Sequence, residues 1–157
     1  MSDEGSAAAP GKFTVRRVYL KDSSFESPRS PSIFASEWNP RVHLDLDTRV
    51  ERMEPEIYEV VLRVTARAST PEGKTGYVVE VHQAGLFEVK GLEGEPLERM
   101  LRTFCPGILF SYAREAVDNM LVKATFRPLM LAPMNFEALY AEARSKATRS
   151  ENENVRH

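Results

Sequence analysis

Apolar residues recur at steps of three and four between residues 104 and 121, and polar residues take the opposite side. This period predicts an amphipathic helix. The apolar stripe continues backwards to Leu97, but Pro106 lacks a backbone amide and its ring clashes with the preceding turn. We therefore predict two helical segments with a break at Cys105 and Pro106. Neither stripe is stable alone in water, so another part of the chain must cover it.

Alternation of apolar and polar residues predicts four strands elsewhere in the chain. They cover residues 13–19, 41–47, 58–68 and 76–89. The third is the clearest, since all its even-numbered residues are apolar. Residues 69–74 are predicted to form a turn, because Pro71 and Gly73 supply suitable backbone angles. We interpret Ala84 and Gly85 as a β-bulge in the fourth strand.

Two further segments are too apolar for free loops and too rich in proline for helices. They are residues 25–38, which hold three aromatic side chains, and residues 126–134. Both are expected to be irregular and anchored to the core. A short final helix is predicted after its capping residue Asn135. Its apolar face contains Phe136, Leu139, Tyr140 and Ala143.

Strands followed by helices are typical of an α+β fold. We predict a four-stranded antiparallel sheet with two helices packed on one face, and the other face in water. A chain of 157 residues suits one domain. We place this domain at residues 13–144, between a disordered tail at 1–12 and a flexible C-terminal tail at 145–157.

Composition narrows the class of protein. The formal net charge of −2 gives no drive toward nucleic acid. Cys105 is the single cysteine of the sequence, which excludes an intrachain disulfide and a cysteine-based zinc site. The sequence has no apolar run of about 18 residues and no basic, apolar start, so neither a membrane span nor a signal peptide is expected. These features favour a soluble cytoplasmic protein.

The sequence shows no catalytic constellation, and we predict that the protein is not an enzyme and holds no metal or cofactor. Lys74 follows a glycine, but a phosphate loop needs another glycine where Ala68 stands. The histidines are scattered without metal-ligand spacing, at His43, His82 and His157. Asp45 and Asp47 share a strand face, which we interpret as solvated. A weak enzyme hypothesis depends on the polar helix residues Arg114, Glu115 and Asp118.

An unusual number of aromatic and methionine side chains lies outside the predicted helices and strands. For each residue alone, packing on the core is the simpler interpretation. Together they predict an apolar groove that accepts many partners, because thioethers repack easily and rings make contact without strict shape demands. The residues concerned are Phe34, Trp38, Met130 and Met134, with Phe136 and Tyr140 of the final helix.

Five segments resemble SecB, the family of protein-export chaperones of Gram-negative bacteria. They are residues 19–26, 44–48, 58–65, 105–115 and 131–136, and the similarity runs in order from Phe13 to about Tyr140. The resemblance implies an α+β subunit that assembles as a homotetramer, a dimer of dimers. It also implies an ATP-independent chaperone that holds unfolded precursor proteins and delivers them to SecA. The alternative is a protein-interaction adaptor with a single folded partner.

The resemblance also implies roles for individual residues. The SecA-binding surface would contain Asp22, Glu26, Val78 and Glu80. The assembly contact between dimers would involve Val79, Val81 and Gln83. The client groove would be the apolar set from Phe34 to Tyr140 named above.

Three departures from the family pattern are visible in the sequence. His82 and Ala84 stand where the family often has Gln and Gly. Residues 145–157 are mixed in charge, whereas the corresponding tail is usually strongly acidic. Ser111 replaces a common proline, which should make the main helix more regular.

Overall fold

The computed structural model describes residues 11–156, so most of the predicted N-terminal tail and His157 lie outside the described residues. Four antiparallel strands form one sheet in the order β1-β4-β3-β2, as predicted. The strands are β1 (Lys12–Glu26), β2 (Arg41–Glu54), β3 (Ile57–Ser69) and β4 (Thr75–Lys90). β1 and β2 are longer than the alternation pattern suggested, because apolar residues do not alternate strictly in their additional parts, although Phe25 and Val50 there still pack against the core.

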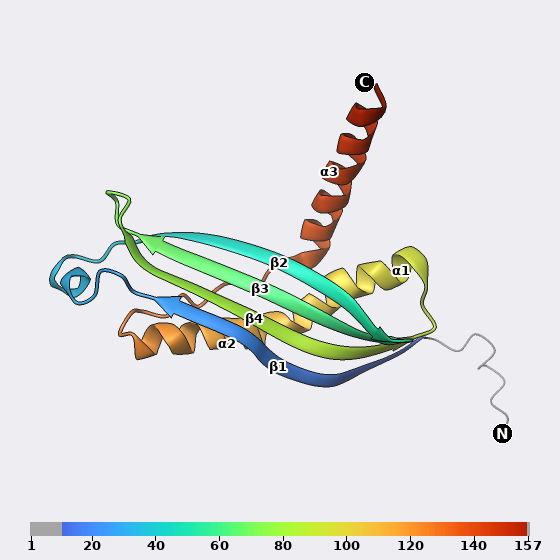
Figure 1. The fold of residues 1–157 in the computed structure, drawn as a ribbon, viewed down its shortest axis with the longest axis horizontal. Coiled ribbons are helices and arrows are strands. Elements are labelled where there is room, and N and C mark those ends of the chain that lie inside the picture. Colours follow the sequence, from blue (N-terminus) through green and yellow to red (C-terminus); the bar gives the residue numbers. More distant parts are fainter. Residues whose placement is uncertain (1–10, 157) are drawn as a thin grey trace.

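One face of the sheet is dry and the other is open. The even-numbered residues of β3 and the odd-numbered residues of β4 point to the dry face, where Val60, Leu62 and Val64 are completely buried. A long helical segment runs along this face beneath the sheet (Figure 1). The alternation of apolar and polar residues along these strands therefore has the predicted cause, which is burial of one face of the sheet only.

The irregularities of the sheet lie in β1 and not at Ala84 and Gly85 in β4, where a bulge was predicted. β4 pairs regularly there, while the β1 register shifts around Arg16 and Lys21. A glycine is needed at residue 85 for a different reason. A Cβ atom there would lie 2.7 Å from the Phe87 ring and 3.1 Å from Leu109. The glycine therefore allows the helix to approach the sheet closely.

The helical segment is continuous through the proline, so the predicted break is wrong. It consists of α1 (Gly94–Arg99), a π-helical turn η3 (Met100–Phe104) and α2 (Cys105–Lys123). The amide of Cys105 donates to the carbonyl of Met100, five residues earlier. A π turn of this kind changes the hydrogen-bond register, and the chain remains helical although Pro106 has no amide to donate.

The two irregular segments meet at one end of the sheet, which confirms that they are anchored. Phe126, just after α2, is buried among three aromatic rings. The ring centroids are 4.9 Å away for Tyr77, 5.3 Å for Trp38 and 5.5 Å for Phe34, which belongs to the 3₁₀ turn η2 (Ser32–Ala35). A Cβ atom on Gly76 would lie 2.2 Å from the Trp38 ring, so that ring rests directly on the β4 backbone.

The last helix is much longer than predicted. α3 (Phe136–Arg156) includes most of residues 145–157, which were expected to form a flexible tail. This stretch has neither Gly nor Pro and is rich in helix-forming Ala, Glu, Arg and Lys. An ion pair of 3.3 Å joins Glu142 and Lys146 one turn apart. α3 leaves the rest of the subunit and points away from the sheet (Figure 1).

The close approach at Gly85 predicts opposite effects for two identical substitutions. We expect Gly85→Ala to lower the free energy of unfolding by about 1–3 kcal/mol, because the new methyl group collides with Phe87 and Leu109. Gly107→Ala is the control, since a Cβ atom on this α2 glycine meets nothing within 4 Å. It should stabilise by about 0.5–1 kcal/mol. Urea denaturation at equal protein concentration measures both, and a Gly85→Ala variant as stable as the parent would contradict this account of the helix–sheet contact.

Candidate functional site

Two neighbouring hollows flank the start of α3. The first, of about 720 Å³, lies between α2 and the segment before α3, and the second, of about 460 Å³, lies between β2 and α3. Met134 and Phe136 line both of them. The walls are mostly apolar, and we call the pair the Phe136 groove. Its other apolar lining residues include Leu44, Leu46, Phe104, Ile108, Pro133, Leu139, Tyr140 and Ala143.

The structure brings together only part of the predicted groove. Met134, Phe136 and Tyr140 lie in the Phe136 groove. Phe136 and Tyr140 are 7% and 8% exposed, so they form its wall and do not project from it. Phe34 and Trp38 belong instead to the aromatic cluster around Phe126 described above. Residues 124–135, which connect α2 to α3, join the two places.

Polar residues of α2 hold this connecting segment. The Asp118 carboxylate accepts hydrogen bonds from the amides of Leu129 (2.9 Å) and Met130 (3.4 Å). Arg114 donates to the carbonyl of Leu131 at 3.2 Å. These are the side chains on which the weak enzyme hypothesis depended, and they fix the backbone that leads to the groove. Met130 itself has a positive φ of 51° and is 75% exposed.

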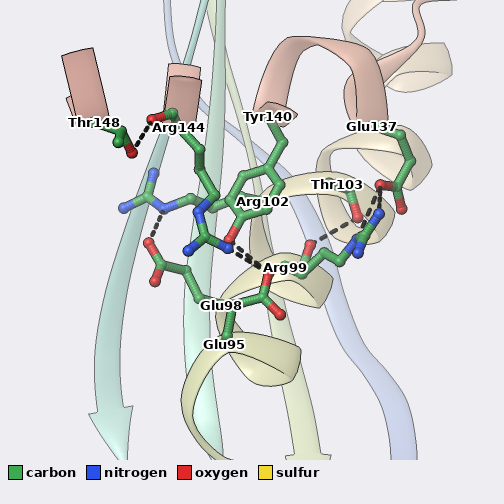
Figure 2. A network of polar contacts seen from close by, with 9 residues as sticks. All are labelled: Glu95, Glu98, Arg99, Arg102, Thr103, Glu137, Tyr140, Arg144 and Thr148. Atoms are coloured by element: carbon green, nitrogen blue, oxygen red, sulfur yellow. Dashed lines mark hydrogen bonds and ion pairs between the residues drawn. The ribbon is translucent and has the colours of Figure 1, made fainter. Parts of the chain in front are cut away.

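A polar network fixes the base of α3 (Figure 2). Arg99 of α1 donates two hydrogen bonds of 2.9 and 3.0 Å to Glu137. Glu95 accepts one of 2.7 Å from Arg144 and one of 3.4 Å from the Tyr140 hydroxyl. The Arg144 guanidinium also lies 5.7 Å from the centre of the Tyr140 ring. These ion pairs are half exposed, so each contributes little, and burial of Phe136 and Tyr140 carries most of the attachment.

Sequence reasoning missed this network because its partners are 38 to 49 residues apart. Glu95 and Arg99 read as ordinary surface charges of a helix. The one available signal was the position of Glu137 and Arg144, two turns apart on the final helix. That spacing places both side chains on one side of α3.

The open face of the sheet carries all four residues that the resemblance to SecB assigns to a SecA-binding surface, which are Asp22, Glu26, Val78 and Glu80. In the β1–β4 register Glu26 lies opposite Val78. Asp22 lies opposite His82, two register pairs away from Glu80. Asp22 and Glu26 are exposed, and Val78 and Glu80 are half-buried. The hydrogen bond from His82 (2.8 Å), followed by that from the Thr65 hydroxyl (2.9 Å), lowers the pKa of Glu80.

A second carboxylate on this face is almost enclosed. Glu59 accepts hydrogen bonds from the Tyr19 hydroxyl and from the Lys21 ammonium, the latter at 2.7 Å. Burial alone would raise the pKa of Glu59, but the hydrogen bonds from Lys21 and Tyr19 outweigh it and lower the pKa. Burial, and then the Glu59 carboxylate, raise the pKa of Tyr19 to about 12. Glu59 is therefore a fixed negative charge on the open face.

Comparison with known proteins identifies the group to which the chain is related. The family described as "Preprotein translocase subunit SecB" matches residues 6–147. The chain belongs to the SecB family. It is 50% identical over 131 residues to the protein-export protein SecB of Pseudomonas aeruginosa PAO1. The aligned region covers 83% of this chain and 80% of that protein. The SecB of Stutzerimonas stutzeri is 46% identical over 145 residues, covering 90% and 88%.

A solved structure supports the SecB fold. It is the SecB-like chaperone Rv1957 of Mycobacterium tuberculosis, in complex with a ChAD peptide from the Rv1956 HigA1 antitoxin. The TM-score is 0.65 over 78% of this chain and 91% of that chain, at 19% sequence identity. The similarity at this identity concerns the fold alone. Together with the sequence relatives, it confirms the resemblance to SecB seen in the sequence.

The SecB resemblance also named three assembly residues, and the structure places them inside the subunit. Val79 and Val81 are completely buried on the sheet face that α2 covers, and Gln83 is 5% exposed. Their side chains therefore offer almost no surface to another chain. The alternation of β4 explains this, because odd-numbered residues of this strand point inward, whereas the even-numbered Val78 and Glu80 point outward.

The remaining candidates of this SecB-family chain have structural explanations. Burial raises the pKa of the Cys105 thiol to about 12, as expected for an inert core cysteine. Lys74 lies in the predicted turn, where the Thr70 amide donates to its carbonyl. Asp45 and Asp47 lie on the open face near His43, Arg49 and Arg63. Residues 11–156 contain no group of three or more metal-binding side chains, and no described helix is long and apolar enough to cross a membrane.

The contacts of Asp118 predict a local change in the connecting segment. Asp118→Ala removes the acceptor of the Leu129 and Met130 amides, so we expect their hydrogen exchange to become roughly tenfold faster. Amide exchange measured by NMR tests this residue by residue. Asn119→Ala is the control, since Asn119 is exposed and its side-chain amide donates to Glu115 of the same helix, at 3.5 Å. Equal exchange at Leu129 in the two variants would show that Asp118 does not hold the segment.

Proposed function

We propose that this chain is an ATP-independent chaperone of protein export, which holds unfolded precursor proteins in a form fit for translocation and delivers them to SecA. The observation that carries the proposal is the Phe136 groove in a chain of the SecB family. The family is one of chaperones and not of enzymes, in line with the structural use of Arg114 and Asp118. We place its action in the cytoplasm, without nucleic acid, nucleotide or membrane insertion.

The size of the groove explains the need for several binding sites. A groove that buries three or four client side chains gains roughly 1.5–3 kcal/mol for each of them. The cost of association and of ordering a flexible chain is about 4–15 kcal/mol. A single groove therefore binds weakly. A long unfolded client that touches several grooves of one assembly binds well, because the later contacts form at high effective concentration.

We propose that the assembly is a homotetramer built as a dimer of dimers. Among residues 11–156, β1 and β2 each have one edge without a neighbouring strand, which leaves backbone groups to pair with another subunit. Two exposed rings lie along the helical segment, Phe104 at the end of η3 and Tyr112 in α2. Val79, Val81 and Gln83 lie beneath α2, so we propose that they influence assembly by setting its position.

We propose that SecA docks on the open face of the sheet around Asp22, Glu26, Val78 and Glu80. Carboxylates attract a basic partner and accelerate its association. The face lies on the opposite side of the sheet from α2. A client and SecA can therefore be bound at the same time, and SecA docking replaces ATP hydrolysis as the step that releases the client.

A charge placed at the rim of the Phe136 groove tests whether clients bind there. Leu139 lines the second hollow and is 40% exposed, so Leu139→Glu should fold normally and place a carboxylate against apolar client side chains. We expect roughly tenfold weaker suppression of aggregation for several unrelated unfolded proteins. Val155→Glu makes the same change on the same helix where the side chain is 85% exposed, and should have no effect. A parent protein that protects just one of these unfolded proteins would be an adaptor and not a general chaperone.

The docking face is tested by charge reversal. In the double variant Asp22→Lys and Glu80→Lys, the affinity for SecA should fall roughly tenfold at low salt, and less at high salt because ions screen the attraction. Binding of an unfolded client should stay unchanged. Titration calorimetry measures both interactions. If client binding is lost while the affinity for SecA is kept, the docking face is assigned wrongly.

A further inference from the structure

The centre of the open face carries a row of four ionisable side chains, one from each strand. In the strand registers Asp22 of β1 lies opposite His82 of β4, His82 lies opposite Arg63 of β3, and Arg63 lies opposite Asp47 of β2. Arg63 and Asp47 approach to 3.6 Å. His82 is therefore the one side chain of the row that can change its charge near neutral pH. It stands beside two of the residues proposed to dock SecA.

His82 contacts one of those residues directly. Its Nε2 atom lies 2.8 Å from Oε2 of Glu80, and since a carboxylate can only accept, Nε2 carries the proton. The second oxygen, Oε1, accepts from the Thr65 hydroxyl at 2.9 Å. The side chains of His82 and Glu80 are 28% and 34% exposed. Both carboxylate oxygens are thus held by fixed partners, while the pair remains within reach of another protein.

We propose that His82 is a positioning residue of the docking face, and that its protonation weakens the docking of a basic partner by neutralising Glu80. Neutral His82 orients the Glu80 carboxylate and leaves its charge available. Protonated His82 forms an ion pair with it, and the local negative charge is lost. The inference rests on the proposed SecA site and adds its regulation.

The other charged groups around His82 do not supply the same effect. His82 also lines a hollow of about 360 Å³ on this face with groups from the three other strands, which are Lys21 of β1, Glu59 of β3, and Arg49 and Glu51 of β2. Lysine and arginine stay charged between pH 5 and 8. The hydrogen bonds from His82 and Thr65 lower the pKa of Glu80, and those from Lys21 and Tyr19 lower the pKa of Glu59 against burial. Both carboxylates therefore remain ionised across this range, so neither of them supplies the proposed change in charge.

The chain offers a matched control on the same face. His43 of β2 lies 3.4 Å from Asp45, so it is also a histidine beside a carboxylate. It is on the opposite edge strand from Asp22 and Glu26, and its side chain is 76% exposed. His43→Gln removes another histidine beside a carboxylate without touching the proposed docking residues.

The test measures the affinity of purified SecA for the full chain between pH 8 and 5.5. For the parent and for His43→Gln, we expect about a twofold to fivefold loss between pH 8 and 5.5, beyond any loss shared by all variants. His82→Gln should lack this extra loss, because glutamine still donates to Glu80 but does not gain charge. Thr65→Val should weaken binding at every pH without changing the profile. Circular dichroism and thermal unfolding at each pH confirm that the variants are folded.

The possible outcomes distinguish the role of His82 from the existence of the docking face. A flat profile for His82→Gln beside a falling one for His43→Gln supports the role of His82. Equal profiles for parent and His82→Gln overturn it, while SecA binding that still depends on Asp22 and Glu80 leaves the docking face intact. No binding of SecA at any pH overturns the docking face and the role of His82 together.

Discussion

The structure depends on keeping one face of a long antiparallel sheet away from water. The apolar side chains of β3 and β4 on this face have no cover from the strands themselves, and α2 is the element that buries them. The depth of this contact requires a glycine at residue 85 and a π turn before Pro106. Once α2 is fixed, its outward residues Arg114 and Asp118 fix the segment that leads to α3, and the Phe136 groove forms where α3 begins.

This arrangement separates two surfaces by the thickness of the sheet. The apolar groove is built on the side of the helices, from α2, α3 and the rim of β2. The charged surface is built entirely by strands on the other side. Because neighbouring residues of one strand point to opposite faces, β4 contributes alternately to the core and to the charged surface. Each substitution in this strand can therefore be assigned to one of the two by its position alone.

The sequence predicted those features that depend on local periodicity. Alternation predicted the four strands and the dry face. Helical spacing and the resemblance to SecB predicted that Met134, Phe136 and Tyr140 lie beside one groove. Features that depend on contacts between distant segments were missed. Gly85 read as a bulge because its neighbour Leu109 is 24 residues away, and Pro106 read as a break because a π turn has no sequence signal that we recognised. The contact of His82 with Glu80 was within reach, since residues two apart in a strand share a face.

Trp38 is the single tryptophan of the sequence, and its ring lies against the β4 backbone at Gly76 and beside Phe126. Phe126 in turn connects it to Phe34 and to the end of α2. The intrinsic fluorescence of the protein at tryptophan-selective wavelengths thus comes from one site with a known environment. Any rearrangement of the segment between α2 and α3 changes that environment, so the unlabelled chain carries its own optical reporter for this end of the sheet.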